Sequence, residues 1–207
     1  MPLTKRRKEQ MFHPYAVEIG KLALEWNRLQ EHLSFLFSVT LGTGNTVMLA
    51  YRIWHSAQSD RAQREMLRAA AEVMFGTELH GQASPKLLED ILWLLDQAQR
   101  LADRRNDAMH SPFILSYGAS GGVTVVPAVF LGHPRAGKLQ GKNVLMEFEW
   151  YRDCARVLAD FAYELFYSLK MAPIAALPAP PLPERPRLPL LGQSKSRKMK
   201  HPRKRAK

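Results

Sequence analysis

Residues 87–112 read LLEDILWLLDQAQRLADRRNDAMHSP, and this stretch decides how the rest of the chain is interpreted. Its apolar side chains recur every three or four residues, which is the spacing of one face of an α-helix. Arg105 occupies a position in this series where an apolar residue is expected. Burying a guanidinium without a partner is costly. We therefore expect Arg105 either to have a partner or to face a binding site. The apolar members of the series are Leu87, Ile91, Leu94, Ala98, Leu101 and Ala108.

The bounds of this helix are also marked in the sequence. Ser84 is a suitable N-cap, and Pro85 fits the first helical position, where its missing N–H is not needed. The helix is expected to end near His110, because the residue before Pro112 is disfavoured in the α region. Residues 105–110, which read RNDAMH and are called the Arg–His motif below, therefore close the helix.

Apolar residues at the same spacing predict a helix on each side of this one and two more upstream. Their expected ranges are about 14–41, 45–57 and 59–75 before it and about 144–171 after it. Several helices with apolar faces, joined mostly by short loops, favour an antiparallel bundle.

A change of pattern separates the last two long helices. Apolar runs at 113–117 and 123–126 flank the glycine-bearing residues 118–122, which predicts a β-hairpin. A basic loop is expected at 132–142. The predicted fold class is therefore all-α, an antiparallel helical bundle with a small β-hairpin insertion before the last helix.

The positive charge is concentrated outside the predicted bundle. The chain has 30 Lys and Arg against 19 Asp and Glu, but residues 173–207 hold ten Lys or Arg against one Glu, and residues 1–10 hold four against one Glu. We divide the chain into a basic N-terminal extension at 1–13, a bundle at 14–172, and a Pro-rich, then Lys/Arg-rich tail at 173–207 with no expected structure. A basic tail of this kind either contacts nucleic acid or only keeps the chain soluble.

Composition excludes several classes of protein. A single cysteine, Cys154, excludes an internal disulfide framework and fits a reducing compartment. The charged N-terminus has no apolar segment behind it, and no apolar run approaches the roughly 18 to 20 residues that cross a bilayer. The seven histidines lack the spacing of metal ligands. We therefore expect a cytoplasmic protein with no membrane partner, no metal and no cofactor.

The Arg–His motif has two interpretations. At roughly 100° per residue, Arg105 lies in the middle of the apolar arc, Asn106 at its margin and His110 beyond Asn106. The three side chains can then line one edge of a cleft, where an arginine, an amide and a histidine suit a phosphodiester. Alternatively, Arg105 forms a structural ion pair with Glu25 or Glu31 on the first helix, and His110 only caps its own helix.

In this helical context the chain resembles the HEPN-domain family, whose signature is an arginine, usually followed by a polar residue, and then a histidine a few residues later. The resemblance covers about residues 14–171 and includes the long first helix and the aliphatic bundle. The residues that carry it are Glu25, Asn27 and Glu31 on the first helix and Arg105, Asn106 and His110 at the end of the penultimate long helix.

The resemblance implies a metal-independent endoribonuclease that acts on RNA as a homodimer, often as a toxin or in phage defence. An antitoxin or a regulatory protein would then be a further partner. His110 would assist attack of the RNA 2′-hydroxyl on the adjacent phosphate. Arg105 would hold that phosphate and stabilise its developing charge, and Asn106 would orient the histidine or a phosphate oxygen. Glu25 and Glu31 are candidates for supporting carboxylates.

Two other functions stay open at this stage. The first is a non-catalytic interaction module of the same fold, tethered to nucleic acid or to a partner by its basic tail. The second is a DNA-binding regulator, although the sequence has no recognisable recognition helix. Four further basic residues are candidates for guiding RNA, with a solvated surface as the alternative: Arg104, Arg135, Lys138 and Lys142.

Overall fold

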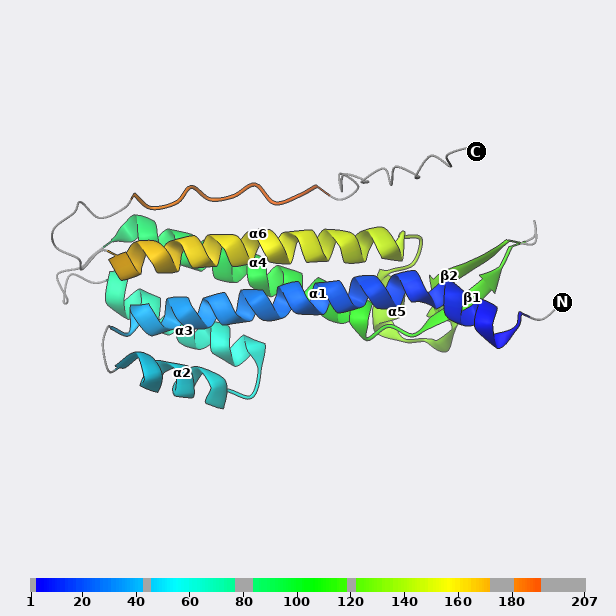
Figure 1. Cartoon of the computed structure of the whole chain (residues 1–207), viewed down its shortest axis with the longest axis horizontal. Helices are drawn as coiled ribbons and strands as arrows, with labels where there is room; N and C mark the ends of the chain where they lie inside the picture. The colour runs from blue at the N-terminus through cyan, green and yellow to red at the C-terminus, as the bar shows by residue number, and fades with distance from the viewer. Residues whose placement is uncertain (1–2, 43–45, 77–83, 119–121, 172–180, 191–207) are drawn as a thin grey trace, which may run out of the picture.

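The computed structural model describes residues 3–42, 46–76, 84–118, 122–171 and 181–190. The long helices are α1 (Lys5–Thr40), α2 (Thr46–Ser56), α3 (Asp60–Gly76), α4 (Pro85–Met109) and α6 (Val144–Met171). The hairpin strands are β1 (Phe113–Tyr117) and β2 (Val123–Pro127), and two short helices follow them, η2 (Val129–Leu131) and α5 (Pro134–Lys138). The predicted fold class, a helical bundle with a small hairpin before its last helix, is confirmed (Figure 1).

Each long helix runs antiparallel to the long helix before it (Figure 1). The chain reverses direction four times between α1 and α6, so these two helices run parallel. They also lie side by side. The contacts between them follow the same order in both helices: Arg28 bonds to Asp160 at 2.5 Å, and the rings of Phe35 and Phe166 lie 5.6 Å apart. The parallel pairing of the first and last helices is a property of the assembled bundle.

Helix α1 begins earlier than predicted. Thr4 is its N-cap and accepts a hydrogen bond from the backbone N–H of Arg7, so residues 5–13, expected as an extension, are the first turns of the helix. These turns include several exposed charged side chains and little of the apolar face, which is why the periodicity alone started the helix near residue 14. Pro14 lies inside the helix at an exposed position.

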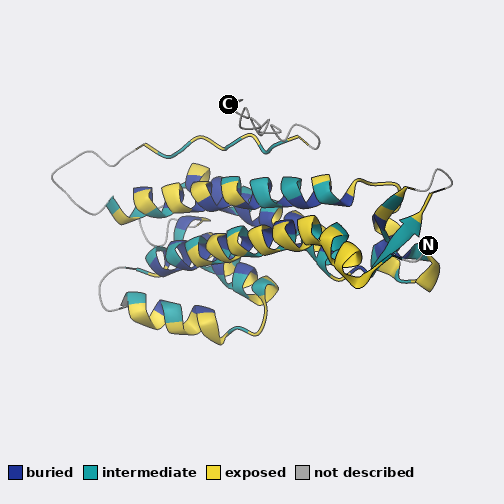
Figure 2. Ribbon diagram, turned by 45° about the vertical axis from the view of Figure 1, so that its right-hand side comes forward, coloured by how far each residue is buried: buried dark blue, intermediate teal, exposed yellow. Residues whose placement is uncertain are grey.

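The predicted apolar face of α4 is buried, as Figure 2 shows for the inner faces of the bundle. It packs against α3 on one side and α6 on the other, where Trp93 meets Phe161 edge to face. Helix α2 lies at the margin of the bundle with Met48, Leu49 and Ile53 exposed. The α4 residues buried as predicted are Leu87, Ile91, Leu94, Ala98, Leu101 and Ala108.

The hairpin forms where the sequence predicted it. Strands β1 and β2 pair antiparallel with Phe113 opposite Pro127 and Tyr117 opposite Val123; residues 119–121 of the expected turn lie outside the described residues. The basic loop expected at 132–142 contains α5, which begins with Pro134 at its first position. Ala136 is the buried residue of this short helix.

Residues 181–190 differ from the expectation of an unstructured tail. They form neither helix nor strand, yet they lie along the bundle, with Leu182 and Leu188 packed against its core. The indole Nε1 of Trp150 on α6 donates to the carbonyl oxygen of Pro189 at 2.7 Å. A proline-rich composition argues against regular secondary structure, but it does not prevent side-chain packing. Residues 173–180 and 191–207 lie outside the described residues.

Among the described residues, no helix is both long and apolar enough to cross a membrane.

Candidate functional site

Arg105 lies where α1, α3 and α4 meet, and its side chain is 19% exposed. The guanidinium carbon lies 4.5 Å from the centre of the Trp26 ring of α1. One nitrogen, Nη2, donates to the Asn106 amide oxygen at 2.8 Å and lies 3.7 Å from Asp60 Oδ2. The cation is therefore packed on an aromatic face and has one carboxylate nearby, as a half-buried arginine requires.

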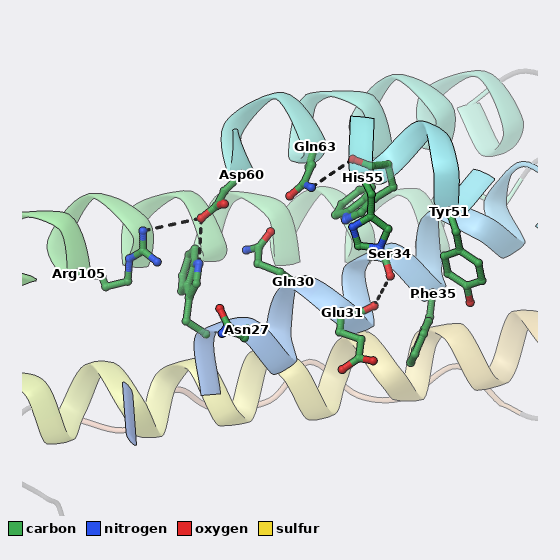
Figure 3. Close-up of a pocket in the computed structure, with 12 residues that line it drawn as sticks. Asn27, Gln30, Glu31, Ser34, Phe35, Tyr51, His55, Asp60, Gln63 and Arg105 are labelled. Carbon is green, nitrogen blue, oxygen red and sulfur yellow. Dashed lines mark hydrogen bonds and ion pairs between the residues drawn. The ribbon is translucent and has the colours of Figure 1, made fainter. Parts of the chain in front are cut away.

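Asp60, the first residue of α3, is shared by two partners. Its Oδ2 accepts a hydrogen bond from Trp26 Nε1 at 2.9 Å and also faces Arg105 (Figure 3). The carboxylate next to Arg105 is thus Asp60, whereas the sequence offered Glu25 or Glu31 as its partner. Glu25 lies 3.6 Å from Arg28 on its own helix, and Glu31 lines a neighbouring cavity. The start of α3 reaches Arg105 only after the chain has folded.

The neutralisation of Arg105 is incomplete. Its Nε is buried and has no hydrogen-bond partner among the described residues. Burial lowers the pKa of the Arg105 guanidinium, and the negative charge of Asp60 opposes that shift. The contact with Asp60, at 3.7 Å, is longer than a charge-assisted hydrogen bond of about 2.8 Å. Arg105 therefore keeps one unused N–H donor, and its positive charge is only partly balanced by Asp60.

A second arginine, Arg64 of α3, lies beside Arg105 and Asp60. It was not among the site residues predicted from the sequence. It is only 4% exposed, and its Nη2 donates to Gln99 Oε1 at 2.8 Å. Its Nε and Nη1 are buried without a partner among the described residues. Burial lowers the pKa of the Arg64 guanidinium, while the charges of Asp60 and Asp103 raise it. The buried Arg64 and the half-buried Arg105 thus both feel the negative charge of Asp60, although Arg105 is the one that lies within ion-pair distance of it.

A signal for Arg64 is present in the sequence. The buried face of α3 consists of Arg64, Leu67, Ala71 and Phe75, at spacings of three and four. An arginine therefore takes an apolar position on α3, just as Arg105 does on α4. The same conflict between charge and position therefore marks both residues.

Two cavities border Arg105. The first, called the large cavity below, has a volume of about 630 Å³. The second, the small cavity, has a volume of about 340 Å³ and is lined by Arg64, Asn106 and the exposed Arg61. Arg105 and Asp60 line both cavities, so they separate two hollows on the same flank of the bundle. The large cavity is shown in Figure 3 and is lined by Trp26, Asn27, Gln30, Glu31, Ser34, Phe35, Tyr51, Trp54, His55, Asp60, Gln63 and Arg105.

Of the three candidate catalytic residues, Arg105, Asn106 and His110, the structure brings two together within one chain. Arg105 and Asn106 are hydrogen-bonded to each other and both line the small cavity. His110 is the C-cap of α4; its backbone N–H donates to the Asn106 carbonyl oxygen at 3.1 Å, and its side chain is exposed. The described lining of the large and small cavities does not include His110. In the described part of the chain, neither of these two cavities brings all three residues together.

The four other basic candidates do not gather around Arg105. Arg104 stacks on the Trp150 ring at 4.9 Å, on the side of α4 that faces α6. Arg135 donates to the Asn106 carbonyl oxygen at 2.9 Å, and Lys138 to Asp107 Oδ2 at 2.8 Å. These two side chains join α5 to the last turn of α4, and Arg135 is a second donor to the Asn106 carbonyl oxygen, which also accepts from the His110 backbone N–H. Lys142 lies 3.9 Å from Glu147.

Among the described residues, no three His, Cys, Asp or Glu side chains are grouped so that they could hold a metal ion. The site offers guanidinium, amide, carboxylate, hydroxyl, imidazole and aromatic groups. No family model matches the chain, and neither a curated protein nor a solved structure matches it.

Proposed function

We propose that this protein is a metal-independent endoribonuclease of HEPN type that acts on RNA as a homodimer in the cytoplasm, in a toxin or phage-defence role. The observation that carries the proposal is Arg105: a half-buried guanidinium on the apolar face of α4, incompletely neutralised, bordering two cavities. A guanidinium in such a setting suits a phosphate, because planar N–H donors match phosphate oxygens and low local polarity strengthens their attraction.

The proposed chemistry divides the reaction between two side chains. Arg105 binds the scissile phosphate and stabilises the charge that develops on it. His110 either takes the proton of the attacking 2′-hydroxyl or delivers a proton to the 5′-oxygen as its bond to phosphorus breaks, and imidazole suits either transfer near neutral pH. Asn106, already bonded to Arg105, fixes the orientation of the guanidinium. The 2′-oxygen supplies the nucleophile, so this reaction needs no metal.

Cleavage on this scheme requires two chains. His110 is exposed at the end of α4 and outside the described lining of the cavities that Arg105 borders. A two-fold axis near the ends of the two α4 helices would place both Arg–His motifs in one cleft. A toxin or defence nuclease of this kind would be held in check by an antitoxin or a regulatory protein.

The test is cleavage of RNA by the purified protein with EDTA present, beside His110→Ala and Arg105→Ala. We expect the wild type to cleave and both variants to lose at least 100-fold in rate, with circular dichroism spectra and melting temperatures close to those of the wild type. A products analysis should show 2′,3′-cyclic phosphate ends. A wild type without cleavage, or a His110→Ala variant with full activity, contradicts the proposal.

A second candidate, a non-catalytic binding module of the same fold, is favoured by a different observation. Asp60 and Asn106 both engage Arg105 within one chain, so the arginine already has internal partners. On this alternative, the wild type binds RNA or a protein partner without cleaving it. The same assay separates the two functions, because only the enzyme gives products that depend on His110.

A further inference from the structure

Gln30 of α1 carries an unsatisfied carboxamide at the large cavity. Its Nε2 and Oε1 are both shielded from water, and neither has a hydrogen-bond partner among the described residues. In Figure 3 the amide points to the side of the cavity where Asp60 and Gln63 lie. Buried amides are nearly always hydrogen-bonded, and an unmade pair of bonds lowers stability. An amide left in this state beside a cavity indicates a ligand that offers one donor and one acceptor.

The surroundings of Gln30 narrow the chemistry of that ligand. Asn27 and Gln63 add two more carboxamides, while Phe35 and Tyr51 contribute partly exposed aromatic rings that lie 5.9 Å apart. Carboxamides read polar edges without adding charge, and aromatic rings stack on flat heterocycles. The volume, about 630 Å³, lies within the range of roughly 300–1,000 Å³ that is usual for small-molecule sites.

Arg105 connects this cavity to the proposed function. It lines the large cavity, so a phosphate bound at its guanidinium would hold the attached nucleoside next to Gln30. The polar and aromatic lining of the cavity suits a nucleobase, and the guanidinium of Arg105 suits a phosphate. Together they match the two halves of a nucleotide.

We propose that the large cavity is a nucleobase-recognition subsite, in which the Gln30 carboxamide reads one edge of a base whose phosphate lies at Arg105. Gln30 reaches the base by a change of side-chain rotamer, which is common on binding even where the backbone stays in place. Adenine is the expected base, because its adjacent donor and acceptor pair with a glutamine amide in two hydrogen bonds. This inference rests on the proposed function for the phosphate-binding role of Arg105, but not on catalysis.

Binding of the four ribonucleoside 5′-monophosphates, measured by isothermal titration calorimetry, tests the subsite without any cleavage. We expect AMP to bind the wild type most tightly and Gln30→Leu to weaken AMP binding at least tenfold. Gln30→Glu replaces the donor by a second acceptor, so it should transfer the preference to GMP, whose base presents adjacent N–H donors. The matched control is Gln97→Leu on α4, which lines a separate cavity next to Leu188 and should bind AMP like the wild type.

The inference is overturned if none of the four nucleotides binds at millimolar concentration, or if Gln30→Leu binds AMP as the wild type does. Circular dichroism of both Gln30 variants verifies that they fold, and Gln30→Glu gives a gain of GMP binding that misfolding cannot imitate. Gln30-dependent AMP binding by a protein that leaves RNA intact supports the subsite and contradicts the nuclease. RNA cleavage without nucleotide binding supports the nuclease and contradicts the subsite.

Discussion

Arg185 Nε donates a hydrogen bond to Asp90 Oδ1 at 2.5 Å, across 95 positions of sequence. The Asp90 side chain is fully buried in α4, and its other partner is Lys86 one turn earlier, at 2.7 Å from both carboxylate oxygens. A second nitrogen of Arg185 lies 3.4 Å from Glu89. The Arg185–Asp90 ion pair holds residues 181–190 against the bundle. It also gives the buried Asp90 carboxylate a second cationic partner besides Lys86.

Replacing Arg185 by alanine should therefore destabilise the fold. We expect Arg185→Ala to lower the free energy of unfolding by about 1–3 kcal/mol, the usual loss when a buried charged group gives up a hydrogen bond. Urea denaturation followed by circular dichroism measures the change. Arg187→Ala is the matched control, because Arg187 is an exposed arginine of the same segment that forms no ion pair among the described residues, and it should change stability by less than about 0.5 kcal/mol. Equal effects of the two variants would show that residues 181–190 are not fastened through Asp90.

Arg64 should lower the stability of the fold while supplying positive charge to the small cavity. A buried guanidinium with one hydrogen bond is less favourable than a packed apolar side chain, so Arg64→Met is expected to raise the free energy of unfolding by about 1 kcal/mol or more. The same variant should weaken RNA binding, because the small cavity loses a cation. Arg68→Met, which removes a partly exposed ion pair with Asp96, is the control and should cost at most about 1 kcal/mol. If Arg64→Met is less stable than the wild type and binds RNA equally well, both expectations are wrong.

Asp60 competes with an anion for Arg105. Two charges about 4 Å apart interact by about 1 kcal/mol in water, so Asp60→Asn should strengthen RNA binding roughly fivefold at low salt. The asparagine oxygen can still accept from Trp26 Nε1, which keeps the fold in place. Fluorescence anisotropy with a labelled single-stranded RNA, in a His110→Ala background that prevents cleavage, measures the affinity. Asp103→Asn, a carboxylate held by Gln99, serves for comparison and should have the smaller effect. Weaker binding by Asp60→Asn would mean that RNA does not use Arg105.

Cys154 should be unreactive in the folded protein. It is 1% exposed, and burial raises the pKa of its thiol to about 12, whereas a free cysteine has a pKa of about 8.5. The thiolate is the reactive form, so at pH 8 a thiol reagent such as dithionitrobenzoate should label less than a tenth of the native protein in an hour. One equivalent should react after unfolding in guanidinium chloride. Rapid labelling of the native protein would place Cys154 at the surface.

Local pattern predicted most of the architecture. The bounds of α4 were predicted from Ser84, Pro85 and Pro112, and its buried face from the apolar spacing. Phe113–Tyr117 and Val123–Pro127 pair as the hairpin that the change of period indicated. These features depend on neighbours within a few residues, which the sequence states directly. The pattern failed at residues 5–13 and 181–190, because a helix with few apolar residues and an extended segment docked on a bundle have no periodic signature.

The site was predictable in part. Arg105 stood out because its charge conflicts with its place on an apolar face, and Arg64 could have been found in the same way. The partner of Arg105 could not, because Asp60 reaches it from another helix 45 positions away in the chain. The cavity beside Gln30 has no sequence signal at all, since its lining comes from four helices, α1, α2, α3 and α4.

By itself, the sequence determined where most of each long helix lies, which face of α4 is buried, and that an arginine lies on that face. All three follow from local spacing and side-chain chemistry. Only the tertiary structure decided that Asp60 and Trp26 contact Arg105 and that Arg185 reaches Asp90. These relationships join residues distant in sequence. They are set by the packing of whole helices, which fixes the distances between side chains from different parts of the chain.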